Sequence, residues 1–351
     1  MQSFTHSAQP SRIVFGRGTL AQAGEEIRRL GAGRALILST PQQAGQAKAL
    51  ADSLGPLAAG LFGGAAMHTP VAVTETALAA YHGAGADCVL ALGGGSTTGL
   101  GKAIAARTGA PQLVIPTTYA GSEVTPILGE TENGVKTTRR GPEILPETVI
   151  YDPDLTDGLP LAMSVTSGLN AMAHAAEGVY AQDGSPVFTL MAVDGLRALK
   201  AALPALMLDP ADREARDTAL YGAWLCGTVL GGVGMSIHHK LCHTLGGALD
   251  LPHAETHAIL LPHTIGYVEA GVPKALAPVA ALFGGRAGRG LYDFARSLGA
   301  PLRLIDLGVR EEQLDALALQ ATANAYWTPR PLHRAAIRDL LGRALTGDAP
   351  V

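Results

Sequence analysis

Cysteine is scarce in this sequence, and the three that occur do not form a disulfide framework. Cys88, Cys226 and Cys242 make no CxxC pair, and their number is odd. This pattern indicates reduced thiols in a cytoplasmic protein. Cys242 lies in a histidine-rich segment, where a thiol could serve as a ligand or a nucleophile. Because the sequence offers it no resolving partner, we expect it to be a packing residue.

Charge and long apolar runs are scarce as well. Charged residues make up 16% of the 351 residues, the net charge is -4 and the basic residues are scattered, so we expect no nucleic-acid partner. Gly, Pro and charged residues interrupt the apolar runs, and residues 1–16 lack the pattern of a secretory signal, so we expect no membrane span or leader. Hydrophobic residues, in contrast, make up 47%. This is ample for packed cores, and the length suits two domains.

Two kinds of pattern divide the sequence. In the first half, short apolar runs alternate with helix-periodic runs, which predicts a parallel sheet covered on both faces. The expected strands are residues 34–39, 87–92, 112–116 and 148–151, and the expected helices are 44–54 and 71–82. Long Ala- and Leu-rich helical patterns follow at residues 164–181, 187–206, 212–226 and 311–323. We therefore predict an α/β domain over residues 1–155 and an all-helical domain over residues 156–351.

A glycine-rich turn follows the second of these strands. Gly93, Gly94, Gly95 and Ser96 stand between the strand and an expected helix. At such a turn backbone N–H groups can face a diphosphate, no side chain intervenes, and the helix N-terminus favours negative charge. In a sequence with 44 glycines a tight turn without a ligand is the alternative. The position at the carboxyl end of a strand favours the binding role, although the spacing is neither GxGxxG nor that of a P-loop.

Residues 116–123 (PTTYAGSE) also follow an expected strand. Their hydroxyls and glycine could line the same crevice as the glycine turn. The alternative is a polar loop that caps the next helix.

Histidines are concentrated in one segment, with six of the eleven in residues 238–263. His239 and His243 are four residues apart, so on a helix they project from one face. His253 follows after a Gly-Gly pair that permits the chain to bend. Upstream, Asn170 and His174 repeat the four-residue spacing. Three histidines and one oxygen-bearing residue would suit a divalent transition metal.

Single histidines are more often packing or solvated residues, and each member has to be weighed on its own. We expect His238 to face elsewhere and to be structural. His257, one turn past His253, could line the pocket. His263 and His333 have no spacing that points to chemistry.

Four motifs in a fixed order resemble those of iron-containing alcohol dehydrogenases, and the resemblance covers nearly the whole chain. They are GGGSTTGLGKAIA, IPTTYAGSEVTP, NAMAHAAE and HHKLCHTLGGALDLPHAETHAILLPH. The resemblance implies the dehydroquinate synthase-like fold of that family, in which an α/β nicotinamide-dinucleotide domain precedes an all-helical catalytic domain. It also implies catalysis in a cleft between the domains, and a homodimer.

The same resemblance implies roles for individual residues. The cofactor diphosphate would lie at Gly94, Gly95 and Ser96, and Thr117, Thr118 and Tyr119 would follow the cofactor towards its nicotinamide. The family's metal ligands, an Asp and three His, fall on Asn170, His174, His239 and His253. The additional histidine near the nicotinamide is His243.

Two departures from the family pattern affect these expectations. Neutral Asn170 replaces an anionic ligand, which should weaken metal binding sharply, so we expect no metal. If one is bound, its ligands would be His174, His239 and His253. Thr40 stands where NAD-preferring members carry an Asp. Without a carboxylate to bond the ribose and repel a 2′-phosphate, either NADH or NADPH is an acceptable cofactor.

The short TTYAGSE loop, the Asn in place of Asp and the PHAETHA segment are similar to those of maleylacetate reductases. This resemblance implies reduction of the alkene of 2-maleylacetate to 3-oxoadipate in the breakdown of aromatic compounds. Hydride addition to the carbon β to the ketone gives an enolate, which hydrogen-bond donors can stabilise without a metal. We expect His243, with His239 and His253 near it, to be the proton donor and oxyanion stabiliser.

The two carboxylates of such a dicarboxylate substrate need cationic partners. The candidates are Lys136, Arg139 and Arg140 in a polar stretch, and Lys240 beside His239. Solvated charges on a surface loop are the alternative for each. Asn170 and His174 are further candidates for the substrate site.

Three other functions stay open at this point. One is a metal-dependent alcohol or aldehyde dehydrogenase of the same family, and another is a non-redox, dehydroquinate synthase-like lyase that regenerates its NAD. The third is a catalytically inactive nucleotide-binding or interaction protein, which a cluster of histidines disfavours.

Overall fold

The computed structural model describes residues 4–8, 11–323 and 326–351, and these form two compact units. The α/β unit spans Ala8–Leu159, and the helical unit begins at Pro160. Residues 4–7 belong to the helical unit, where His6 Nδ1 lies 3.0 Å from Ser185 Oγ. The sequence pattern alone placed them in the first domain, because so short an irregular segment carries no periodicity.

A six-stranded parallel sheet forms the α/β unit, in the order β1-β8-β5-β4-β2-β3. Its strands are β1 (Arg12–Phe15), β2 (Ala35–Leu38), β3 (Ala58–Phe62), β4 (Cys88–Gly93), β5 (Gln112–Pro116) and β8 (Thr148–Tyr151). The four inner strands are the predicted ones. The two edge strands, β1 and β3, are only partly buried, so they lack the continuous apolar run that identifies the others.

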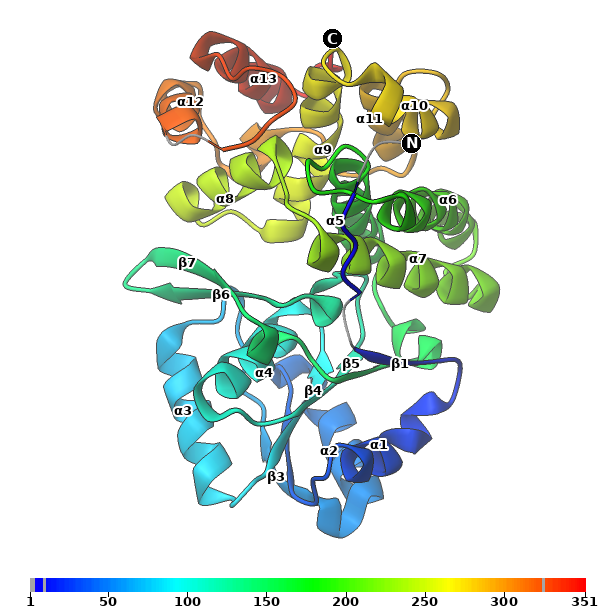
Figure 1. Ribbon diagram of the computed structural model, residues 1–351, viewed down its shortest axis with the longest axis vertical. Helices are drawn as coiled ribbons and strands as arrows, with labels where there is room; N and C mark the ends of the chain where they lie inside the picture. Colours follow the sequence, from blue (N-terminus) through cyan, green and yellow to red (C-terminus); the bar gives the residue numbers. More distant parts are fainter. Residues whose placement is uncertain (1–3, 9–10, 324–325) are drawn as a thin grey trace. The chain divides into compact units, whose positions relative to one another are not determined.

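Helices cover both faces of this sheet (Figure 1). They are α1 (Ala23–Arg29) and α2 (Ala44–Leu54) on one face, and α3 (Val71–Gly83) and α4 (Gly95–Thr108) on the other. Successive residues of the inner strands point to opposite faces. Ile37 and Leu90 therefore pack against α1 and α2, while Leu36 and Val89 pack against α3 and α4. The predicted fold class is confirmed.

An antiparallel hairpin occupies the polar stretch that contains Lys136, Arg139 and Arg140. It consists of β6 (Ile127–Glu132) and β7 (Val135–Arg140), joined by Asn133 and Gly134. Both turn residues have positive φ, 49° and 75°, as a two-residue hairpin turn requires. Because the residues of β7 are mostly exposed, the segment lacks an apolar pattern, and nothing in the sequence indicated this hairpin.

The helical unit is built around α5 (Leu161–Gly178), which has fifteen of its eighteen residues buried. The other helices are α6 (Pro186–Leu208), α7 (Arg213–Gly232), α8 (Ile237–Leu249), α9 (His253–Glu269), α10 (Pro273–Leu282), α11 (Ala287–Ser297), α12 (Leu314–Ala323) and α13 (Arg334–Thr346). The long helical patterns predicted from the sequence correspond to α5, α6, α7 and α12.

The bend between α8 and α9 does not lie at the Gly-Gly pair, as we had expected. Gly246 and Gly247 are inside α8, and the chain turns at Asp250, whose φ is 51°. Asp tolerates this left-handed conformation, and Pro252 directly precedes α9. Both the Gly246-Gly247 pair and the segment Asp250–Pro252 could have formed the turn. The chain turns at Asp250, and the two glycines are part of helix α8.

In the described part of the chain, no single helix has the length and hydropathy to cross a membrane. One pair, Arg213–Gly232 with Ile237–Leu249, meets the criterion only when taken together, and it is bent by 92°.

Candidate active site

The glycine turn lies at the carboxyl end of β4, as predicted. Gly93 ends the strand with φ +151°, and a Cβ there would overlap the side chains of Thr97 and Gln43. Gly94 precedes the first turn of α4 and gives it no side-chain cap. The backbone N–H groups at the start of α4, which include those of Gly95 and Ser96, therefore have no capping oxygen. Their donors and the helix dipole suit an anionic group.

The second motif adjoins this turn. The backbone N–H of Thr117 donates to the carbonyl oxygen of Gly93 at 3.1 Å, and a Cβ on Gly94 would lie 3.0 Å from Thr118 Oγ1. Thr118 is partly exposed. The structure thus brings together the two segments whose contact the sequence could only suggest.

Gln43 joins a third strand end to these two, and sequence reasoning missed it. Its Nε2 donates to Thr117 Oγ1 at 2.7 Å, and its Oε1 accepts from Thr40 Oγ1 at 3.2 Å. One side chain therefore connects the loops that follow β2 and β5, directly over Gly93. A glutamine in a loop carries no sequence signal for such a role.

Tyr119 is completely buried. Its place along the cofactor stays a prediction. The described cofactor candidates with access to solvent are Gly94, Gly95, Ser96, Thr118 and Thr40.

Lys102 is a second residue that sequence reasoning missed. It is fully buried in α4, and its Nζ donates to the Ser122 and Ile127 carbonyl oxygens at 2.5 and 2.9 Å and to Thr125 Oγ1 at 2.9 Å. Burial lowers the pKa of Lys102 to about 7, partly offset by the charge of Glu123. The side chain fixes the segment that follows the second motif.

In the helical unit, His174 and His239 form a hydrogen-bonded imidazole pair between α5 and α8. His174 Nδ1 lies 3.0 Å from His239 Nε2. Glu177 anchors the pair, because its Oε2 accepts from His239 Nδ1 at 2.6 Å. We call His174, His239 and Glu177 the carboxylate-anchored pair. With Nδ1 donating to Glu177, the Nε2 of His239 either accepts from His174 or, once protonated, donates to it.

Glu177 also holds the start of α8. Its Oε1 accepts from the backbone N–H groups of Ser236 at 3.2 Å and His238 at 2.8 Å, and from the Tyr180 hydroxyl at 3.1 Å. Burial alone would raise the pKa of Glu177, but the hydrogen bond and the charge of His239 outweigh it and lower the pKa to about 2. The carboxylate therefore stays ionised and orients His239.

His238 and His257 form a second pair between α8 and α9. His238 Nε2 lies 3.0 Å from His257 Nδ1, and His238 Nδ1 lies 3.0 Å from Thr264 Oγ1. Since the Thr264 hydroxyl donates to the carbonyl oxygen of Leu260 or Leu261, it accepts from His238 Nδ1. We call His238, His257 and Thr264 the hydroxyl-anchored pair.

Both imidazoles of this second pair are buried and uncharged. Burial, together with the charge of His239, lowers the pKa of His238 to about 3, and burial also lowers the pKa of His257. His238 thus has other partners than His239, although the centroids of the two neighbouring rings lie 5.4 Å apart. Its position on α8, next to His239, could not reveal the partner on α9.

The remaining predicted histidines adjoin the two pairs. His243 is exposed on α8, and its ring meets that of His239 edge-on with centroids 6.2 Å apart. His253, at the start of α9, is partly exposed and lies 4.2 Å from His257 between centroids. Six histidines of α5, α8 and α9 thus form one cluster, namely His174, His238, His239, His243, His253 and His257. The spacing in the sequence had pointed to four of them, His174, His239, His243 and His253.

The cationic candidates do not share one face. In β7, Lys136 and Arg140 alternate with Arg139, so Arg139 points to the opposite side of the hairpin. Lys240, in α8, places its Nζ 5.7 Å from the centroid of the Tyr326 ring. The hairpin and the histidine cluster belong to different units.

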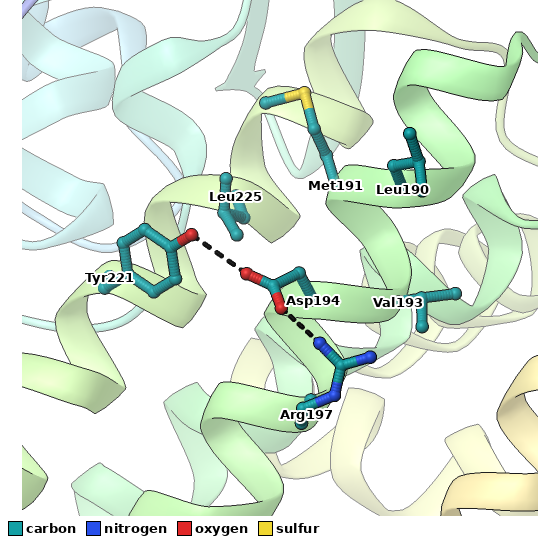
Figure 2. A pocket seen from close by; sticks show the side chains of 7 residues that line it. All are labelled: Leu190, Met191, Val193, Asp194, Arg197, Tyr221 and Leu225. Atoms are coloured by element: carbon teal, nitrogen blue, oxygen red, sulfur yellow. Dashed lines mark hydrogen bonds and ion pairs between the residues drawn. The ribbon is translucent and has the colours of Figure 1, made fainter.

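A surface hollow on α6 and α7 is separate from this cluster. Figure 2 shows the residues that line it, which are Leu190, Met191, Val193, Asp194, Arg197, Tyr221 and Leu225. Asp194 accepts from the Tyr221 hydroxyl at 2.9 Å and pairs with Arg197. None of the predicted site residues lines this hollow.

Chemically, the helical unit offers groups that can transfer protons, and the α/β unit offers an anion-binding turn at the end of a strand.

The first half of the chain, residues 10–153, matches the model of iron-containing alcohol dehydrogenases, and residues 164–345 match the C-terminal model of that family. The chain belongs to the iron-containing alcohol dehydrogenase family.

Its relatives within this family include several named maleylacetate reductases. The chain is 69% identical over 350 residues to the one from Rhizobium sp. strain MTP-10005 and 53% identical over 351 residues to the one from Burkholderia cepacia, with 100% of each chain covered. A crystal structure of maleylacetate reductase from Agrobacterium tumefaciens superimposes with a TM-score of 0.97 at 69% identity, and 100% of both chains is covered.

The residues that would hold the family's metal do not form a closed set of ligands here. Asn170 is neutral, and its buried Oδ1 has no hydrogen-bond partner among the described residues. Among the described histidines, cysteines and carboxylates, the group that brings three ligand atoms within 4.8 Å of one another is His238, Cys242 and His257. His174, His239 and His253 do not meet that criterion. We therefore derive no step through a metal at these positions.

Proposed function

We propose that this member of the family reduces the alkene of 2-maleylacetate to 3-oxoadipate, with NADH or NADPH as the hydride donor. The observation that carries this proposal is the 69% identity to a maleylacetate reductase over the full length of both chains. The carboxylate-anchored pair beside His243 supports it, because a reduction through an enolate needs a proton donor and an oxyanion stabiliser.

The reaction requires one hydride and one proton. A reduced nicotinamide held at the glycine turn would supply the hydride to the alkene carbon β to the ketone. The electron pair of the alkene would then move to the ketone oxygen as an enolate. The carbon α to the ketone then takes up a proton as the enolate collapses. In our proposal, His243 supplies this proton, and hydrogen bonds from His253 stabilise the enolate oxygen.

The carboxylate-anchored pair suits the resupply of that proton. A proton on His239 is stabilised by the buried Glu177 carboxylate, and it can move between His239 Nε2 and His174 Nδ1 over 3.0 Å. His243 lies next to His239 on the same helix. Protonated His239 would thus recharge His243 through solvent or substrate between turnovers.

Further residues are proposed partners of the cofactor and of the substrate carboxylates. We infer that the diphosphate binds at Gly94, Gly95 and Ser96, with Thr117 and Thr118 along the cofactor. Thr40 carries no charge, so it does not repel a 2′-phosphate, which supports the use of both NADH and NADPH. Lys136, Arg139, Arg140 and Lys240 are the proposed cations for the substrate, and Asn170 could donate its amide to it.

We also infer a cytoplasmic homodimer. The location follows from the cysteine pattern of the sequence, and the dimer follows from the family resemblance. Light scattering coupled to size exclusion would test the dimer.

A steady-state assay tests the proposed reaction. Purified protein should oxidise NADH or NADPH when 2-maleylacetate is added, with 3-oxoadipate as the product. His243→Ala should lower kcat by about 100-fold, the usual range for loss of a general acid, with little change in cofactor binding. The exposed His82 of α3 gives a matched control, and His82→Ala should leave turnover unchanged.

Two outcomes would contradict the proposed reaction, and a third would contradict the role of His243. Oxidation of simple alcohols in preference to maleylacetate reduction, with loss of activity on chelation, would favour the metal-dependent dehydrogenase. Turnover without any net change in nicotinamide absorbance would favour the non-redox lyase. Near-normal kcat in His243→Ala would remove that residue from the mechanism.

A further inference from the structure

Three side chains of the types that bind metals meet in the interior of the helical unit. His238, Cys242 and His257 each bring one ligand atom within 4.8 Å of the others, and all three are buried. His238 and Cys242 are one turn apart on α8, and His257 faces them from α9. We propose that these residues form a binding site for a borderline-soft transition-metal ion of the zinc class.

Two of the three distances between the ligand atoms can be compared with those around such an ion. Cys242 Sγ lies 3.6 Å from His238 Nε2, and His238 Nε2 lies 3.0 Å from His257 Nδ1. Tetrahedral zinc, with bonds of about 2.3 Å to sulfur and about 2.05 Å to nitrogen, sets these separations at about 3.6 and 3.4 Å. The sulfur-to-nitrogen distance fits, whereas the two nitrogens would have to separate by about 0.4 Å to hold the ion.

Thr264 orients the first ligand. Because its hydroxyl accepts from His238 Nδ1, the lone pair of His238 Nε2 faces Cys242 and His257. Metal-bound histidines usually donate their second nitrogen to an oxygen in this way, and that contact fixes the tautomer and the ring. The other ring nitrogen of His257, Nε2, is buried without a hydrogen-bond partner among the described residues.

The ligand set and its surroundings select the kind of ion. A thiolate and two imidazoles favour zinc-class or copper-class ions and disfavour magnesium and calcium, which prefer oxygen. A divalent ion with one thiolate carries one net positive charge. The ionised Glu177, which accepts from the backbone N–H of His238, provides the compensating negative charge nearby.

This site differs from the one that the family implies. It shares no residue with Asn170, His174, His239 and His253, and it contains a thiolate that the family's set lacks. An ion here would tie α8 to α9 across the turn at Asp250. It would thereby fix the helices that carry His243 and His253.

Cobalt provides the test, because a thiolate bound to Co²⁺ gives a charge-transfer absorption band that imidazole and carboxylate ligands do not give. Since the site is buried, the full-length protein should be produced in cobalt-supplemented minimal medium, so that the ion is present during folding. We expect about one cobalt per chain and a thiolate band in the purified protein. Cobalt-edge X-ray absorption should show one sulfur and two imidazole nitrogens.

Matched variants separate this site from any other. Cys242→Ala and His257→Asn should abolish the band and most of the bound cobalt. Cys226→Ala and His263→Asn should keep both, since each removes another buried residue of the same type from outside the group. Folded wild-type protein without a thiolate band, or with a sulfur-free cobalt shell, would overturn the proposal, as would an unchanged band in Cys242→Ala. If that variant does not fold, the X-ray absorption of the wild type still decides.

Discussion

The two imidazole pairs of the helical unit have the same distance between their ring nitrogens, but different groups anchor them. In each pair two ring nitrogens lie 3.0 Å apart, and a third contact fixes the far nitrogen of one ring. That contact is the Glu177 carboxylate in one pair and the Thr264 hydroxyl in the other. The first anchor is an anion and the second is neutral, although both are buried.

This difference decides which pair can carry a proton. A buried imidazolium is stable only beside a compensating charge, and Glu177 supplies one to His239. Thr264 supplies none to His238, and burial lowers the pKa of His238 to about 3. The carboxylate-anchored pair is therefore suited to proton transfer, and the hydroxyl-anchored pair to holding a fixed lone pair.

Removing the anion should have the largest effect. In Glu177→Gln the amide nitrogen would donate to His239 Nδ1, which forces the proton of His239 onto Nε2. We expect the free energy of unfolding at pH 7 to fall by about 3 kcal/mol, the range for breaking a buried charged contact. Loss of the orienting carboxylate should lower kcat roughly 10- to 100-fold. Urea unfolding and steady-state kinetics would measure both.

The pH dependence of this effect has a definite sign. The pKa of Glu177 is about 2 in the folded chain and is lower than in the unfolded chain, where it has the ordinary value of 4.5. Its contribution is therefore complete above pH 4.5 and is lost as the pH falls towards 2. Glu177→Gln should lack this part of the acid slope. The exposed Glu25, substituted by Gln as a control, should change neither quantity appreciably, and an equal loss in both variants would refute the anchoring role.

The strands, the glycine turn and the helix that carries His239 and His243 could be predicted from the sequence, because each depends on local backbone preference or on periodicity. The buried inner strands have continuous apolar runs, and the glycine turn stands directly after one of them, so its place at a sheet edge followed. The His239 and His243 spacing placed both on one helix. These inferences need only the neighbours of a residue along the chain.

The contacts that the sequence did not predict join residues that are far apart along the chain. Glu177 meets His239 from 62 residues away, and Gln43 meets Thr117 from 74 residues away. A glutamate in a helix or a glutamine in a loop has many possible roles, and no local pattern chooses among them. The second pair was missed for the same reason, because His238 and His257 are paired by the packing of α8 against α9.

His263 is a buried histidine that belongs to neither pair, so it shows how a buried imidazole without an anchor behaves. His263 has no hydrogen-bond partner at either ring nitrogen among the described residues. Burial, with the charge of Arg343, lowers its pKa to about 4. Between pH 6.5 and 4 the unfolded chain binds a proton that the folded chain does not, so this histidine makes stability fall as the pH falls.

His263→Leu should therefore flatten the pH dependence of stability. We expect the variant to lose on the order of 2 kcal/mol less than the wild type between pH 7 and pH 4. At pH 7 it should be as stable as the wild type or more so, because an unpaired buried polar ring is replaced by an apolar side chain. Thermal unfolding across this pH range would measure the difference. Parallel pH curves for the two proteins would show that His263 does not stay neutral in the folded chain.

Removing the neutral anchor should have the smallest effect. Thr264→Val keeps the shape of the side chain but leaves His238 Nδ1–H without its acceptor, which should cost about 1 to 2 kcal/mol in unfolding free energy. Thr256→Val is the matched control, since Thr256 is also buried on α9 and its hydroxyl donates to the Pro252 carbonyl oxygen. The difference between these two variants isolates the contact with His238. If Thr264→Val costs as much as Glu177→Gln, a hydroxyl anchors a buried imidazole as strongly as a carboxylate does, and the distinction between the pairs fails. If it costs no more than Thr256→Val, then His238 is held by Cys242 and His257 alone.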